Sequence, residues 1–239
     1  MRAHATLAVH EGACRWRDAP PVALRRTGEA RFHLVQTAGG PIGGDDLRLD
    51  VALDDGCEVE LCSVAATIVQ PGHGTAPARW RMLVELGHGA RLRWAQPAVV
   101  CERAYYETEL LVRLRDRAQA IVREEIVLGR AGESGGRYRG RLAVNVGSAP
   151  LLRHDSLLDG ADADLCGPAG TGGYRALGTM VVAGDEVRLP DELAYRDSGL
   201  VWSVSPLAGP GFLVVVLSTS SSAVSRTLDE AERRFAAQD

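Results

Sequence analysis

The sequence predicts a mainly β fold, in which two-strand units stack in a solenoid-like arrangement and an amphipathic helix ends the chain. Apolar and polar residues alternate with period two through most of the chain, as in strands that bury one face. Turns rich in Gly, Asp or Arg follow Leu53, Leu86 and Leu114, so a two-strand unit recurs about every 30 residues. Only the C-terminal segment changes to a helical period.

The first three units are predicted to be hairpins. Each joins two alternating segments through a three-residue connection that favours a tight turn. A fourth hairpin is expected where a GSAP turn joins 141–146 to 151–158. The segments of the first three units are 47–53 with 57–64, 80–86 with 90–95, and 107–114 with 118–128.

The chain beyond the fourth hairpin begins with small and acidic residues. The segment 160–173, GADADLCGPAGTGG, has no periodic pattern and predicts a loop. Three further apolar segments, near 175–183, 199–204 and 212–218, predict strands.

The last segment predicts an amphipathic helix. Val224, Leu228, Ala231 and Phe235 are spaced by four, three and four residues, so they share one helical face. The serines at 220–222 can cap the helix N-terminus. This helix is expected to pack on the sheets or to contact a partner. The ion pairs expected on its polar side are Asp229–Arg233 and Glu230–Arg234.

Composition limits the classes of function. The 239 residues suit one large β domain or two small ones, and we take 1–239 as a single domain. The formal net charge of -4 disfavours a general nucleic-acid-binding protein. No apolar run is long enough for a membrane span or a secretory leader, so no membrane association is expected. The five cysteines are unpatterned, which favours reduced thiols and a cytoplasmic protein.

The segment GGPIGGDD, residues 39–46, has the glycine spacing of a phosphate-binding loop. Such a loop requires Lys and then Ser or Thr after the last Gly, to hold phosphate and magnesium. Asp45 and Asp46 occupy those positions, and the chain contains no lysine. The segment is therefore interpreted as a glycine-rich turn between strands, with two acids that invite a further role.

The segment GESGG, residues 132–136, matches the G-x-S-x-G pattern of hydrolases. That pattern requires a helix after the serine, whereas the following residues alternate like a strand. His154 is the only histidine after Ser134, and no acid lies between them, so the usual Ser–Asp–His order is absent. We therefore expect no catalytic triad here, and the protein is not predicted to be an enzyme.

Two adjacent acidic pairs, Asp45–Asp46 and Glu124–Glu125, are the candidate metal ligands. If 118–128 is a strand, one of Glu124 and Glu125 faces inward, where a carboxylate needs a partner or water. Arg123 or Arg130 could be that partner. Alternatively, the acids line a wet internal passage that a cation enters. No H-x-H, C-x-x-C or H-E-x-x-H pattern is present, so no closed zinc site is indicated.

Five segments in order resemble the UreD (UreH) family of urease accessory proteins, from about residue 28 to the end. They are GGPIGGDDLRLDV (39–51), SVAATIV (63–69), WAQPAVV (94–100), EEIVLGRAGE (124–133) and VVVLSTSSSAVSRTLDEAERRF (214–235). The motif residues within them are Gly39, Gly40, Gly43, Gly44, Thr67, Gly129 and Arg130.

The resemblance implies a non-enzymatic scaffold or metallochaperone for nickel insertion into urease. It implies apo-urease, a UreF-like accessory protein and, through that protein, a UreG-like GTPase as partners. It also implies layered sheets that wind in a β-helix-like way. Nickel(II) would be in transit, with no permanent cofactor, and its transient ligands would be Asp45, Asp46, Glu124 and Glu125. Carboxylates suit such a path because strong ligands would trap the ion.

Two alternatives to a nickel conduit remain. One is a β-solenoid carbohydrate-active enzyme that uses paired carboxylates as acid and nucleophile or base. Such enzymes usually stack sugars on aromatic side chains, and aromatic residues make up only 5% of this chain. The other is a scaffold that never contacts the metal.

Overall fold

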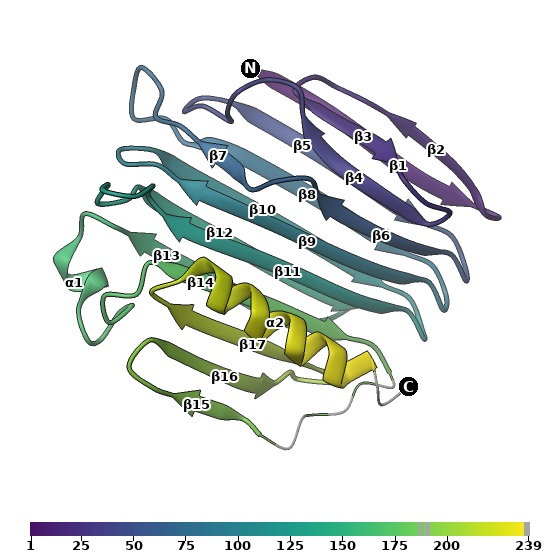
Figure 1. Cartoon of the computed structure of the whole chain (residues 1–239). Helices are drawn as coiled ribbons and strands as arrows, with labels where there is room; N and C mark the ends of the chain where they lie inside the picture. Colours follow the sequence, from purple (N-terminus) through teal and green to yellow (C-terminus); the bar gives the residue numbers. More distant parts are fainter. Residues whose placement is uncertain (186, 188, 190–191, 237–239) are drawn as a thin grey trace.

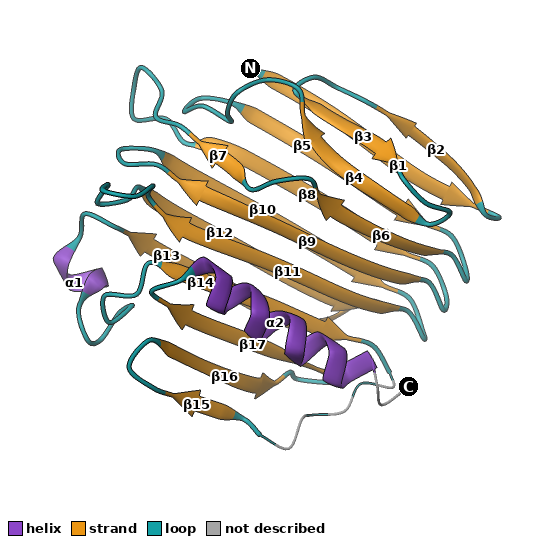
Figure 2. Ribbon diagram, viewed as in Figure 1, coloured by secondary structure: helices purple, strands orange, loops and turns teal. Residues whose placement is uncertain are grey.

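The computed structural model of the protein describes residues 1–185, 187, 189 and 192–236, with only the backbone described for 235–236. The chain forms two facing sheets that wind as a solenoid, with one helix packed on the outside (Figure 1 and Figure 2). The prediction of a mainly β, solenoid-like fold with a C-terminal helix is confirmed. Among the described residues, no helix is both long and apolar enough to span a membrane.

Sheet A has seven strands in the order β13-β12-β10-β8-β5-β1-β2. Its strands are β1 (Arg2–His10), β2 (Ala13–Arg17), β5 (Asp46–Leu53), β8 (Ala78–Leu86), β10 (Tyr105–Leu114), β12 (Arg137–Val146) and β13 (Ala149–Asp159).

Sheet B has ten strands, nine in the order β15-β16-β17-β14-β11-β9-β6-β4-β3, with β7 pairing with β9. Its strands are β3 (Val22–Arg26), β4 (Arg31–Gln36), β6 (Glu58–Ser63), β7 (Thr67–Val69), β9 (Arg91–Val100), β11 (Gln119–Leu128), β14 (Ala176–Ala183), β15 (Ala194–Arg196), β16 (Leu200–Pro206) and β17 (Gly211–Ser218).

The prediction that the first three units are hairpins is wrong. Strands β5, β8 and β10 belong to sheet A, whereas the strands that follow them, β6, β9 and β11, belong to sheet B. Each turn therefore carries the chain from one sheet to the other, and each strand pairs in parallel with its counterpart in the next coil. The two strands of a unit meet through side chains because each has one apolar face to bury. The fourth unit, β12–β13, is an antiparallel hairpin as predicted.

The repeated leucines mark equivalent positions of successive coils. Leu53 lies in register with Leu86, and Leu86 with Leu114, and all three are buried. Their carbonyl oxygens accept hydrogen bonds from Gly87, Arg115 and Gly147 of the following turns, at 2.7 to 3.0 Å. The turns thus stack in the same way as the strands.

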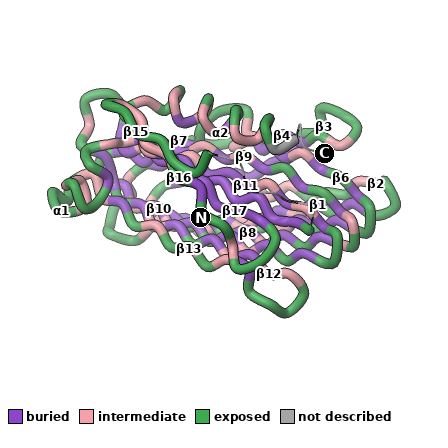
Figure 3. The backbone as a smooth tube through the Cα atoms, turned by 90° about the horizontal axis from the view of Figure 1, so that it is seen from below, coloured by how far each residue is buried: buried purple, intermediate pink, exposed green. Residues whose placement is uncertain are grey.

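The main core fills the space between the sheets, and a second, smaller core lies under the C-terminal helix. In Figure 3 the buried segments run along the strands and the turns are exposed. Helix α2 (Ser221–Ala236) packs on β11, β14 and β17, with Val224 and Leu228 fully buried. Gly178 makes this close approach sterically feasible, because a Cβ there would lie 2.4 Å from Val224 Cγ1.

The predicted helix and the last three predicted strands are confirmed, the strands as β14, β16 and β17. On the helix, Ala231 packs partly buried against the second core, while the Phe235 side chain lies outside the described residues. Glu230 pairs with Arg234 as expected, but Asp229 pairs with Arg123 of β11. The predicted loop 160–173 contains one helical turn, α1 (Ala163–Cys166).

Candidate functional site

Three neighbouring strands of sheet B each place one polar residue on the face that points at sheet A. Gln96 of β9, Glu124 of β11 and Thr179 of β14 are in mutual register and are 5%, 9% and 5% exposed. The alternate residues beside them, such as Val122 and Ile126, belong to the main core. Polar groups therefore cross three strands side by side within an apolar interior.

Sheet A contributes hydroxyl groups to the same interior. Thr108 of β10 lies in register with Trp80 of β8 and Gly140 of β12. A Cβ at Gly140 would lie 2.2 Å from the Tyr138 hydroxyl, so glycine there leaves room for that hydroxyl. The Tyr138 and Thr108 hydroxyls form a hydrogen bond of 2.9 Å.

The carboxylate of Glu124 lies at these hydroxyls. The Tyr138 hydroxyl donates to Glu124 Oε2 at 3.5 Å. Burial raises the pKa of Glu124 to about 7, although hydrogen bonds from Thr108 and Tyr138 oppose the shift. Arg123, its neighbour in the chain, points to the other face of the sheet. Glu124 therefore has no ion-pair partner among the described residues, and near neutral pH it can exist in either protonation state.

Several buried polar atoms on β6, β8 and β9 have no hydrogen-bond partner within the described chain. They are both amide atoms of Gln96, the Ser63 hydroxyl and the indole N–H groups of Trp80 and Trp94. An unsatisfied buried polar group costs about 1–3 kcal/mol, so such groups are few in native proteins and usually bind water or an ion. We call the whole set the interior polar row: Ser63, Trp80, Trp94, Gln96, Thr108, Glu124, Tyr138 and Thr179.

Beside the interior polar row, the ladder between β9 and the strands β6 and β7 is interrupted. Leu61 pairs with Trp94, and Thr67 pairs with Ala98. The β6–β7 chain therefore has more residues than β9 between these pairs, and the surplus segment 64–66 is exposed. This segment bulges away from β9 next to Gln96, as in a β-bulge.

A groove of about 400 Å³ opens at this interruption. Its lining includes Gly39, Gly40, Ser63 and Thr67, and the Gln36 amide donates to the Thr67 hydroxyl at 3.3 Å. Ser63 belongs both to the groove and to the interior polar row. Two of the segments that resemble the UreD family, at 39–51 and 63–69, thus meet where polar interior groups approach the surface.

The predicted turn at GGPIGGDD is present, and its glycines have a steric reason. A Cβ at Gly43 would lie 2.8 Å from the Gly72 amide nitrogen and 2.9 Å from the Ala76 carbonyl oxygen. Gly44 has a φ of 94°, which glycine adopts most readily. The turn therefore brings two backbones close together.

The two acids of this turn are satisfied locally. Asp45 accepts a hydrogen bond of 3.0 Å from the Ile42 amide and pairs with the N-terminal ammonium of Met1. Asp46 forms a two-oxygen contact with Arg81 on the outer face of sheet A. The structure does not bring either acid to the interior polar row.

Glu125 also lies apart from the row, on the opposite face of β11. Its carboxylate pairs with Arg123 at 2.7 Å and accepts a hydrogen bond from the Ser225 hydroxyl of α2. Of the four acids predicted as nickel ligands, only Glu124 belongs to the polar interior. The role of all four toward nickel stays a prediction.

The segment after β11 forms a tight turn around Gly129 and Arg130. Gly129 has a φ of 76°, and a Cβ there would lie 2.8 Å from the Gly135 amide nitrogen. Arg130 pairs with Glu133, which also accepts the Arg130 backbone N–H. The contact with Arg130 and two backbone hydrogen bonds lower the pKa of Glu133 to about 2. Gly129 therefore allows the close approach of the two backbones in this turn, and Arg130 stabilises the turn through Glu133.

Comparison with known proteins identifies the family. The profile of the UreD urease accessory protein family matches residues 7–238. The chain belongs to the UreD family. It is 37% identical to the urease accessory protein UreD of Parafrankia sp. (strain EAN1pec), over 89% of this chain and 80% of that protein. It is 33% identical to UreD of Frankia alni, over 95% and 91% of the two chains, and 35% identical to UreD of Streptomyces avermitilis, over 88% and 86%. The resemblance to UreD is confirmed.

Within this UreD-family chain, the sequence predicted that one of Glu124 and Glu125 faces inward, but it did not identify most of the surroundings of that acid. Thr108, Tyr138 and Thr179 were not singled out, because a single polar residue in an alternating strand carries no signal of what it faces. Gln96 had a usable signal. It occupies an inward position between Trp94 and Ala98, where the strand pattern calls for an apolar residue.

Proposed function

We propose that this UreD-family protein is a non-enzymatic urease accessory protein that helps to insert nickel into apo-urease. It would act with a UreF-like accessory protein and, through that protein, with a UreG-like GTPase, in the cytoplasm. Family membership and the printed names of its relatives support the accessory role. The observation that carries the nickel path is the interior polar row, with one carboxylate of raised pKa among unpartnered polar atoms.

The row has the chemistry of a path for a divalent cation. Hydroxyl and amide oxygens can replace part of the water around Ni²⁺, and the single carboxylate supplies one negative charge. A pKa near 7 lets Glu124 give up its proton as a cation arrives and recover it as the cation leaves. One carboxylate among neutral ligands holds the ion weakly, which suits transit.

The groove lined by Ser63 and Thr67 is the proposed entrance or exit of this path. At this groove Ser63 of the row reaches the surface between β6 and β7. Asp45, Asp46 and Glu125 have partners of their own, so we centre the path on Glu124.

The geometry does not favour a carbohydrate-active enzyme. A glycosidase needs two carboxyl groups on either side of one glycosidic bond, about 5–9.5 Å apart. Glu124 and Glu125 point to opposite faces of sheet B, and Asp46 pairs with Arg81 outside sheet A. Neither acidic pair forms such a site.

The test replaces Glu124 by Gln in cells that co-express urease and its accessory proteins. Gln keeps the shape and an acceptor for Tyr138 but removes the negative charge. We expect lower nickel per urease, measured by mass spectrometry, with unchanged recovery of the accessory complex. Glu125→Gln, one residue away on the opposite face, serves as the control and should leave the nickel content unchanged. Full nickel content with Glu124→Gln would remove the row from the path, and low nickel with lost complexes would support only a scaffold.

A further inference from the structure

The outer face of sheet A is uncovered over its central strands. Helix α2 packs on sheet B, and α1 packs beside β13 at the edge of sheet A. Six of the seven strands of sheet A have eight residues or more. With about 4.8 Å between strands and about 3.3 Å per residue, this face measures roughly 25 Å by 25 Å. One side of a standard protein interface covers about 800 Å², so the face has nearly that extent.

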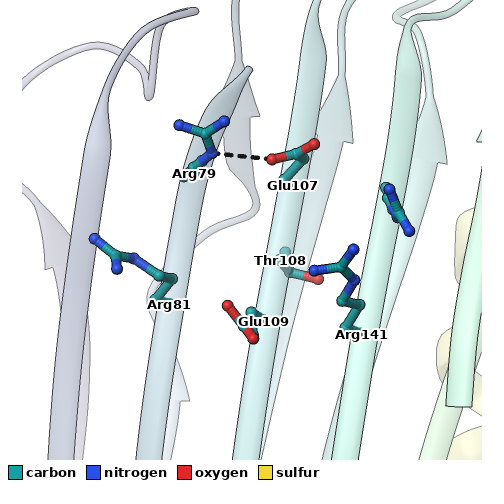
Figure 4. A pocket seen from close by; sticks show the side chains of 7 residues that line it. Arg79, Arg81, Glu107, Thr108, Glu109 and Arg141 are labelled. Atoms are coloured by element: carbon teal, nitrogen blue, oxygen red, sulfur yellow. Dashed lines mark hydrogen bonds and ion pairs between the residues drawn. The ribbon is translucent and has the colours of Figure 1, made fainter. Parts of the chain in front are cut away.

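Columns of opposite charge run along the central strands of this face. Two rows of side chains cross β8, β10 and β12 in register, each with a glutamate between two arginines. They line a hollow of about 310 Å³, shown from close by in Figure 4. The rows are Arg79–Glu107–Arg139 and Arg81–Glu109–Arg141.

Only half of these charges are paired within the chain. Arg79 donates to Glu107 at 3.0 Å, and Arg81 pairs with Asp46 at 2.6 Å. Arg139 and Arg141 of β12, by contrast, form no ion pair with any described residue. In Figure 4 the guanidinium group of Arg141 lies among the side chains that line the hollow, on the strand next to Glu109. Two arginine charges on one strand are thus left without an ion pair among the described residues, although Arg139 lies close enough to Glu107 to lower the pKa of that carboxyl.

The side chains around these arginines are of the kind that anchor protein interfaces. Arg137 stacks on the Tyr105 ring, with its guanidinium carbon 5.0 Å from the ring centroid. Leu157 of β13 lies in register with Arg139 and is 46% exposed. Arginine and aromatic residues are enriched at interfaces and at their energetic hot spots. We call this set the arginine face: Tyr105, Arg137, Arg139, Arg141 and Leu157.

We propose that the arginine face is a docking surface for a protein partner that presents clustered carboxylates. Arginine forms two-point contacts with carboxylates, so two such residues two positions apart on one strand select paired acids on the partner. A nucleic acid fits less well, because Glu107 and Glu109 lie between the arginine columns and the chain has a net charge of -4. Asp155 and Asp159 of β13 lie in register with Arg141 and Arg137 and reduce the positive potential of the surface. The surface therefore favours a partner whose carboxylates match the positions of the arginines over any small anion.

This proposal concerns the outer face of sheet A, whereas the interior polar row lies between the sheets. Thr108 belongs to the row and also lines the hollow, but no residue of the arginine face belongs to the row, and the proposal does not depend on nickel transfer. Charge-mediated docking of this kind weakens as salt increases, because exposed charges are screened over about 8 Å at 0.15 M ionic strength. The binding should therefore fall steeply between about 0.05 and 0.5 M salt.

The test measures fluorescence polarisation of a labelled hexaglutamate peptide on the purified full chain. We expect salt-sensitive binding that Arg141→Glu or Arg139→Glu weakens about tenfold. Arg113→Glu is the matched control, since Arg113 lies on the same face but already pairs with Glu85 at 2.8 Å. It changes the net charge equally and should alter the affinity less than about twofold.

A third variant tests the direction of the effect. Glu109→Gln removes the acid between the arginine columns and should tighten peptide binding about two- to threefold. The proposal is overturned if the wild-type chain does not bind the peptide, or if Arg113→Glu weakens binding as much as Arg141→Glu. It is also overturned if a labelled hexathymidylate binds more tightly at the same residues, because the ligand would then be a phosphate chain.

Discussion

Glu124 and Glu125 are neighbours in the chain, yet they occupy opposite environments. Glu124 lies in the interior polar row, where it meets hydroxyl groups and forms no ion pair with the residues that the structure describes. Glu125 lies under α2, where Arg123, itself only 8% exposed, neutralises it. The difference shows that the environment of a carboxylate depends on the face of the strand it occupies. On one face it forms a stabilising ion pair, and on the other it has no ion pair and a raised pKa.

The side of β11 beneath α2 is built for stability. Arg123 contacts Glu125 at 2.7 Å, Asp229 at 2.6 Å and Glu232 at 3.8 Å, and it donates to the Ser225 carbonyl oxygen. On this side only the Nε of Arg123 lacks a hydrogen-bond partner among the described residues, whereas the interior side leaves both amide atoms of Gln96 and the indole N–H of Trp94 without one. A protein tolerates such unsatisfied groups where function requires them.

The largest expected effect is on stability and comes from removing Arg123, the shared cation on the α2 side of β11. Arg123→Met leaves three acids near α2 without their shared cation, so we expect a loss of about 3–5 kcal/mol in the free energy of unfolding. Urea denaturation followed by circular dichroism measures it. Arg123→Met combined with Glu125→Met should recover part of the loss, because Glu232 keeps its ion pair with Arg93 at 2.8 Å and the Asp229 side chain is 54% exposed. A single variant as stable as the wild type would contradict the role assigned to this cluster.

The second effect is a pH dependence of the unfolding free energy, which we expect from Glu124. The pKa of Glu124 is raised from 4.5 to about 7, so the folded state binds more protons than the unfolded chain in this window. The stability from this group is therefore fully present below about pH 4.5 and is lost as the pH rises through about 7, by up to roughly 3 kcal/mol. Unfolding free energies measured from pH 5 to 8 should fall more for the wild type than for Glu124→Gln. Parallel curves for the two proteins would show that Glu124 titrates normally.

The smallest effect comes from Gln96 and tests whether the interior polar row lowers the stability of the protein because its polar groups are needed for function. Gln96→Leu removes two buried amide atoms without partners, so the isolated protein should gain about 1 kcal/mol in stability. The same variant should lower the nickel content of co-expressed urease. Greater stability with unchanged nickel would mean that Gln96 has no part in transfer. A loss of stability would mean that ordered water or an ion already satisfies its amide.

Much of the architecture was readable from local pattern. Alternation revealed the strands, and the leucines at 53, 86 and 114 revealed the repeat, because equivalent turn positions in stacked coils bury the same type of side chain. The helical face of Val224 and Leu228 was visible for the same reason. No prediction covered strands β1–β4: β2, β3 and β4 have only five or six residues, and none of the four has the turn spacing of the later coils.

The candidate site was only partly readable. One of Glu124 and Glu125 had to face inward, but which one depends on the face that sheet B turns toward sheet A. Asp45 and Asp46 looked equally suited to a metal, and only their contacts with the N-terminus, Ile42 and Arg81 show that each is already satisfied.

By itself, the sequence determined the β class, the repeat, the glycines of the turns, the terminal helix and the UreD family. Each of these depends on neighbouring residues or on ordered motifs. Tertiary structure alone decided that each turn crosses between sheets, since a hairpin and a crossing turn share the same alternating pattern. It also brought Thr108, Glu124 and Tyr138 together. These residues lie on three different strands in two sheets, and only the packing of the sheets makes them neighbours.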